Sequence, residues 1–139
     1  MIALIDTNVV VASFLVRPSD SPVFRIVRGM LEGRFSYLLS VELLAEYRNV
    51  LLRPTIRRRH ALTDEEVDLF LEEVAFMGIV RELILPCKSS PDPGDDHLWQ
   101  LLNAQPGSIL VTGDHKLQDN PPDFASVLSP ASFCAQTGI

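Results

Sequence analysis

Hydrophobic residues occur in short continuous runs that alternate with longer segments of helical periodicity. The runs predict five strands, at residues 1–6, 35–39, 80–85, 108–112 and 126–128. The periodic segments predict helices at residues 7–16, 22–31, 41–53, 64–77, 95–105 and 130–136, with a short helix after Asp114. Because strands that alternate with helices typically form a parallel sheet, the pattern predicts an α/β fold with a mostly parallel sheet.

Several helix boundaries carry recognisable end signals. Ser21 is followed by proline at the first helical position, and Ser40 is placed to cap the helix at residues 41–53. Pro54 is expected to end that helix. Thr63 and Glu66 form a capping-box pattern that opens the helix at residues 64–77.

The size and composition indicate one globular domain over residues 1–139. Hydrophobic residues make up 47% of the 139 and charged residues 22%, which excludes a disordered or low-complexity chain. No apolar run approaches the roughly 18–20 residues of a membrane span. Cys87 and Cys134 are expected to be free thiols, since the N-terminus lacks a secretory signal pattern. We therefore expect a cytoplasmic protein without a membrane segment.

Acidic residues follow three of the predicted strands. Asp6 ends the first strand, Asp114 lies two residues beyond the fourth, and Asp92, Asp95 and Asp96 follow the loop after the third. Ligands of parallel sheets bind at the carboxyl ends of the strands, so these acids are candidates for a common site. The alternative for Asp6, Asp95 and Asp114 is that each caps the following helix.

Helix geometry selects among the acids, at about 100° per residue. Glu46 lies at the border of the apolar face of its helix, whereas Glu42 should face solvent. The alternative for Glu46 is a surface ion pair with Arg48 or Arg53. In the later helix Asp95 shares a face with Leu98 and Leu102. Asp95 is therefore preferred, with Asp92 and Asp96 as alternatives.

Carboxylates that converge on one cleft repel each other, and a cation or protons must relieve the repulsion. Oxygen-rich acidic sites suit Mg²⁺ or Mn²⁺, which commonly act on phosphate groups. No pair of histidines or cysteines has the spacing of zinc ligands. The acids therefore favour phosphoryl chemistry assisted by Mg²⁺ or Mn²⁺.

Four motifs in order resemble the PIN domain nucleases. They are Ile5-Asp6-Thr7-Asn8-Val9, Ser40 six residues before Glu46, Asp92-Pro93-Gly94-Asp95-Asp96 before a helix, and Val111-Thr112-Gly113-Asp114. The overall pattern is similar to the prokaryotic PIN proteins known as VapC-like ribonuclease toxins. The order and spacing of the four motifs cover essentially the whole chain.

The resemblance implies a three-layer α/β/α sandwich and a metal-dependent endoribonuclease that is the toxin of a toxin–antitoxin pair. It assigns catalysis and metal binding to Asp6, Glu46, Asp95 and Asp114, with Asn8 and Thr112 as polar supports. It also implies an RNA substrate, a homodimer and a cognate antitoxin protein. Two alternatives stay open: a catalytically inactive PIN-type binding scaffold and, with less support, a receiver-like signalling domain.

The charges are unevenly distributed. The net charge is −6, yet residues 1–63 carry nine arginines and five acids, whereas the remainder carries three bases and thirteen acids. A basic run of Arg53, Arg57, Arg58 and Arg59 is a candidate for binding RNA phosphates. The alternatives are a solvated helix end and a patch that docks an acidic partner.

Overall fold

A computed structural model describes residues 1–16, 20–83 and 89–139. Within these ranges, five strands form one sheet in the order β3-β2-β1-β4-β5, and every pairing between them is parallel. The strands are β1 (Ile2–Ile5), β2 (Ser36–Leu39), β3 (Ile79–Val80), β4 (Ile109–Val111) and β5 (Ser126–Leu128). The predicted α/β class and the parallel sheet are confirmed.

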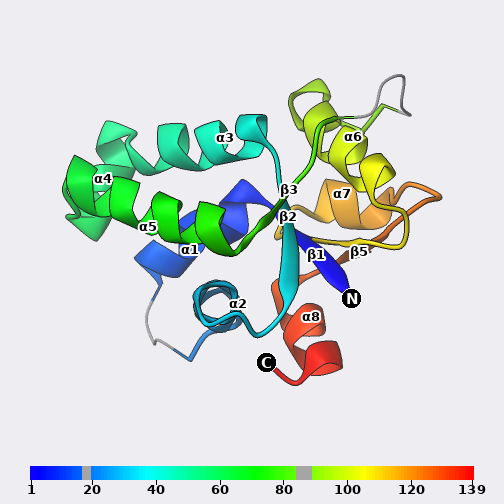
Figure 1. The fold of residues 1–139 in the computed structure, drawn as a ribbon, viewed down its shortest axis with the longest axis horizontal. Coiled ribbons are helices and arrows are strands. Elements are labelled where there is room, and N and C mark those ends of the chain that lie inside the picture. The colour runs from blue at the N-terminus through cyan, green and yellow to red at the C-terminus, as the bar shows by residue number, and fades with distance from the viewer. Residues whose placement is uncertain (17–19, 84–88) are drawn as a thin grey trace.

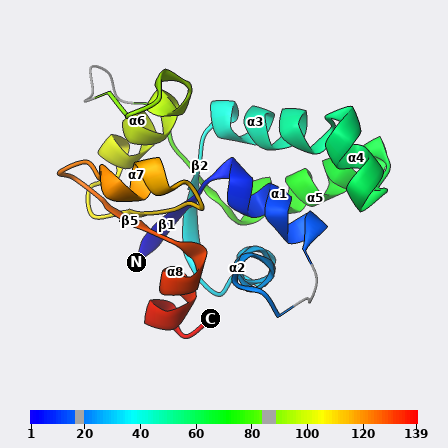
Figure 2. The ribbon, with the colours of Figure 1, turned by 180° about the vertical axis from the view of Figure 1, so that it is seen from behind.

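Helices lie on both sides of this sheet. Within the described ranges they are α1 (Thr7–Leu15), α2 (Pro22–Leu31), α3 (Val41–Leu51), α4 (Pro54–His60), α5 (Asp64–Met77), α6 (Asp96–Ala104), α7 (His115–Asp119) and α8 (Pro130–Thr137), with a 3-10 turn η1 (Pro93–Asp95). Helices α1 to α5 occupy one side, α6 and α7 occupy the other, and α8 packs against α2 (Figures 1 and 2). The arrangement is a three-layer α/β/α sandwich.

The segment after α3 differs from the sequence prediction. The structure ends α3 at Leu51 rather than at residue 53, and it contains a further helix, α4, over the basic run. Pro54 not only stops the preceding helix but also occupies the first turn of α4, where its missing N–H group costs nothing. Helix α4 ends at His60, and the next residue, Ala61, caps it with a left-handed φ of 59°.

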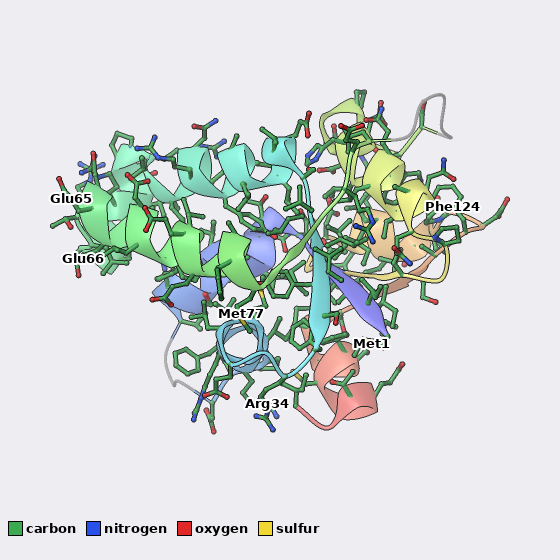
Figure 3. The ribbon with its side chains drawn as sticks, in the orientation of Figure 1. Met1, Arg34, Glu65, Glu66, Met77 and Phe124 are labelled. Carbon is green, nitrogen blue, oxygen red and sulfur yellow. The ribbon has the colours of Figure 1, made fainter. Side chains whose placement is uncertain are left out.

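The third strand is shorter than predicted and begins one residue earlier. Of the predicted 80–85, Val80 lies in β3, residues 81–83 are not in a strand, and residues 84 and 85 lie outside the described residues. Helix α5 runs from Glu65 and Glu66 at its outer end to Met77 beside α2 (Figure 3). Gly78 then packs against β2, where a Cβ atom would lie only 2.4 Å from Leu39 Cδ1. This close approach brings the chain into register with β2 at Ile79.

The strand order creates a crevice at the carboxyl edge of the sheet. From β1 the chain proceeds to β2 and β3 on one side, and then returns to β4 and β5 on the other. The inner strands are buried on both faces, because consecutive residues, which point to opposite faces, are 0% exposed in each: Leu4 and Ile5, Leu38 and Leu39, Leu110 and Val111. In parallel sheets, ligands bind where the strand order reverses, so a ligand site is expected at the carboxyl ends of β1 and β4.

Within the described ranges, no helix has both the length and the apolar character needed to span a lipid bilayer. Cys134 is a buried free thiol, as predicted, and Cys87 lies outside the described residues.

Candidate active site

Asp6 lies at the end of β1 and is only 5% exposed. Its backbone N–H group continues the sheet by donating to the Val111 carbonyl (3.0 Å), which fixes the position of the residue. Its Oδ1 accepts from the Thr7 backbone N–H group (2.8 Å) and so caps α1. Capping and a role in a site are therefore compatible at Asp6, because its second carboxylate oxygen faces another set of partners.

Those partners come from Asn8 and from the end of β4. The Thr112 hydroxyl donates to Asp6 Oδ2 (2.7 Å), and the Asn8 amide donates to the same oxygen (3.2 Å). Asn8 Oδ1 in turn accepts from the Gly113 backbone N–H group (3.0 Å). The Thr112 hydroxyl oxygen also accepts from the Asp114 backbone N–H group (3.0 Å). This polar network ties the ends of β1 and β4 together and orients Asp6.

Glu46 reaches the same edge of the sheet from α3. It is half-buried, whereas Glu42 is exposed, as the helix geometry predicts. Neither Arg48 nor Arg53, the partners considered from the sequence, forms an ion pair with Glu46. Arg48 binds Asp68 (2.8 Å). Instead, Glu46 Oε2 lies 2.8 Å from Nε2 of His97 on α6.

His97 is a site residue that the sequence reasoning missed. It lies four residues before Leu101, which is 0% exposed, so it borders the buried face of α6 much as Glu46 borders that of α3. The helix-face geometry that selected Glu46 would also have selected His97 if it had been applied to histidines as well as to acids.

The three neighbouring acids after β3 have different surroundings. Asp92 Oδ1 accepts from the Gly94 backbone N–H group (3.0 Å), and Asp96 Oδ1 accepts from that of Ser90 (2.8 Å). Asp95 occupies the N-cap position of α6, yet its side chain makes no capping hydrogen bond. Its carboxylate is thus available to the site, while Asp92 and Asp96 stabilise the local turn.

Asp114 follows β4 and caps α7, with Oδ1 accepting from the Lys116 backbone N–H group (2.9 Å). Asp6, Glu46, Asp95 and Asp114 line one open pocket of about 410 Å³, which we call the acidic pocket. Its other walls include apolar side chains of α1 and α3. Among the described residues, Arg53 is the one arginine or lysine that lines it. Asp92 and Asp96 do not line this pocket.

The acids of the pocket perturb one another. Burial, followed by the negative charges of Asp6, Asp92, Glu46 and Asp114, raises the pKa of Asp95 to about 6. Burial also raises the pKa of Asp6, opposed by the hydrogen bonds from Thr112 and Thr7. The contact between His97 and Glu46 lowers the pKa of the carboxyl and raises that of the imidazole. The pocket therefore concentrates negative charge that is only partly compensated.

The donor set fits a hard divalent cation. All four acids offer oxygen ligands, and the carboxylate of Asp95 is not used in capping α6, so its oxygens are open to a cation. In the part of the chain that the structure describes, no three acidic, histidine or cysteine side chains converge into a ready-made metal cage. Mutual repulsion disfavours a closer approach of the four carboxylates.

The basic run begins at Arg53, in the turn before α4, and continues on α4 itself. Arg53 reaches the acidic pocket, Arg57 forms an ion pair with Asp64, and Arg58 and Arg59 are exposed on α4. Only Arg53 is placed to contact a ligand within the pocket itself.

The family model of the PIN domain matches residues 3–116, which run from β1 to the start of α7. The chain therefore belongs to the PIN domain family, and the receiver-like alternative is wrong. PIN domains are generally nucleases and typically use divalent metal ions. No curated protein and no solved structure matches this chain.

Proposed function

We propose that this PIN domain is a metal-dependent endoribonuclease that cleaves single-stranded or structured RNA. The observation that carries the proposal is the acidic pocket at the carboxyl edge of the sheet, lined by all four acids of the predicted quartet. Such a site suits a phosphodiester substrate, because a cation held there offsets the repulsion between the acids and the phosphate. Family membership adds the expectation of nuclease chemistry.

Asp6, Glu46, Asp95 and Asp114 would hold Mg²⁺ or Mn²⁺ in this pocket. When bound, the ion supplies a Lewis acid that polarises phosphoryl oxygens and makes water more acidic. Thr112 and Asn8 keep Asp6 oriented through their hydrogen bonds to Oδ2. Arg53, at the rim of the site, would bind a phosphate group of the RNA, and the exposed Arg58 and Arg59 would extend this contact along the backbone.

The biological setting proposed is the toxin of a toxin–antitoxin pair in the cytoplasm, acting as a homodimer and inhibited by a cognate antitoxin protein. This part rests on the resemblance of the sequence motifs to the toxins of the family. Co-purification of the chain with the product of a neighbouring gene would support it.

The activity is tested with purified protein and a labelled single-stranded RNA, in the presence of Mn²⁺, Mg²⁺ or EDTA. We expect cleavage with either metal, none in EDTA, and none with Asp6→Asn, since asparagine keeps the helix cap but removes the charge. Asp123→Asn is the matched control, because this acid is exposed and outside the pocket. Cleavage by Asp6→Asn at the wild-type rate would refute the site, and no cleavage together with no metal binding would identify an inactive binding scaffold.

A further inference from the structure

His97 joins the two helical layers across the carboxyl edge of the sheet. Helices α3 and α6 lie on opposite sides of the sheet and contact each other there (Figures 1 and 2). The 2.8 Å contact between His97 Nε2 and Glu46 Oε2 spans this junction. The side chains are 18% and 33% exposed, respectively, so the pair is partly shielded from water.

This contact leaves the two oxygens of Glu46 in different situations. Oε2 faces His97 and is closed off from solvent. Glu46 also lines the acidic pocket, so Oε1 would be the oxygen that it offers to a cation there. Glutamate has three side-chain torsions, and a contact that fixes one oxygen restricts the orientations available to the other.

We infer that His97 is a positioning residue, which holds Glu46 by one oxygen so that the other is presented to the cation in the acidic pocket. The inference rests on the proposed function of that pocket. Partners of this kind orient metal-binding side chains, and their loss typically weakens metal affinity by about 10–100-fold. Within the described residues, His97 is the basic side chain that lies within ion-pair distance of Glu46, whereas Arg48 is engaged by Asp68.

The test is a calorimetric titration of the full-length chain with Mn²⁺. We expect His97→Ala to weaken Mn²⁺ binding about tenfold, and His97→Gln to recover most of the affinity. The glutamine amide reaches about as far as Nε2 and can donate to the same oxygen. His115→Ala is the matched control, since this histidine directly follows Asp114 but is exposed and does not line the pocket.

A second comparison separates positioning from direct binding of the metal. If His97 acts through Glu46, then adding His97→Ala to Glu46→Gln should change Mn²⁺ affinity no further. A double variant that binds more weakly than Glu46→Gln would make His97 a ligand in its own right and overturn the inference. Circular dichroism verifies the fold of each variant, and His97→Asn, which is too short to reach Glu46, replaces the alanine variant if that one unfolds.

The possible failures are distinguishable. Equal Mn²⁺ affinity of the wild type, His97→Ala and His97→Asn overturns this inference and leaves the proposed function standing. A wild-type chain that binds no Mn²⁺, under conditions in which it is folded, overturns the proposed function and this inference together.

Discussion

The Thr112 hydroxyl donates a 2.7 Å hydrogen bond to Asp6 Oδ2, although the two residues are 106 positions apart in the sequence. Both side chains are buried, and the same hydroxyl oxygen accepts from the Asp114 backbone N–H group. One neutral side chain thus fixes two acids of the pocket. Because a buried carboxylate without donors is costly, this contact bears on stability as well as on the site.

Thr112→Val should therefore destabilise the protein while preserving the volume of the side chain. We expect the free energy of unfolding to fall by about 1–3 kcal/mol, since Asp6 loses a buried donor and the Asp114 N–H group loses its acceptor. Urea denaturation monitored by circular dichroism measures this change. Thr112→Ser keeps the hydroxyl and should retain Mn²⁺ affinity, whereas valine should weaken it; a valine variant with wild-type stability and affinity would contradict this role.

Asp95→Asn should stabilise the metal-free protein at neutral pH. The pKa of Asp95 is raised from 3.8 to about 6 on folding, so the native state holds the proton more tightly than the unfolded chain. The ionised side chain consequently costs stability that is absent below about pH 4, grows as the pH rises to about 6 and stays constant above it. Because the residue is partly exposed, solvent screening reduces the expected gain to about 1 kcal/mol.

Thermal denaturation at pH 4 and pH 7.5 tests this sign. The difference between Asp95→Asn and the wild type should be visible at pH 7.5 and vanish at pH 4, with Asp123→Asn unchanged at both. Mn²⁺ should reverse the order at pH 7.5, because a ligand that binds only the native state stabilises it in proportion to its affinity. An asparagine variant that is less stable than the wild type in EDTA would show that the repulsion is not present.

Arg53→Gln should weaken RNA cleavage without weakening the fold. Arg53 lines the acidic pocket and is exposed, so its loss removes a phosphate contact but little packing. We expect kcat/KM to fall about tenfold, mainly through KM, and the salt dependence of RNA binding to become shallower. Arg34→Gln is the control, since Arg34 is exposed, does not line the pocket and lies beside α2 and α8, away from α4 (Figure 3); an equal loss in both variants would indicate only a nonspecific effect of charge.

Ala61→Gly should stabilise the junction between α4 and α5. Ala61 has φ of 59°, and left-handed backbone costs an alanine about 1–2 kcal/mol. Glycine removes that cost but gains freedom in the unfolded chain, so the net stabilisation should be about 0.5–1 kcal/mol. Ala75→Gly, inside α5, should have the opposite sign, with a loss of about 1 kcal/mol; the same sign for both substitutions in urea denaturation would rule out the backbone explanation.

The sequence pattern predicted the sheet well because its strands are short, apolar and separated by clear helix signals. Ser40 and Thr63 cap their helices as predicted, with hydrogen bonds to the Leu43 and Glu66 backbone N–H groups. Helix α4 was missed because a proline was interpreted only as a stop. The start of β3 was missed by one residue because the register depends on how Gly78 packs against β2, which is a long-range contact.

Of the candidate site, the sequence identified Asp6 and Asp114 from their positions after strands, and Glu46 from helical geometry. It preferred Asp95 but kept Asp92 and Asp96 as alternatives, since three acids within five residues have similar local patterns. Their separation depends on which backbone N–H groups are nearby after folding: Asp92 and Asp96 each accept one, whereas Asp95 remains free to face the pocket.

The sequence by itself determined the α/β class, the family and the acids that reach the carboxyl edge of the sheet, because these follow from periodicity, capping and local spacing. The tertiary structure decided the strand order, the separation of Arg57 from Arg53 and the partner of Glu46. The contact between His97 and Glu46 joins residues 51 positions apart on opposite sides of the sheet. No local pattern encodes such a distance, since it is set by how two helices pack over the ends of the strands.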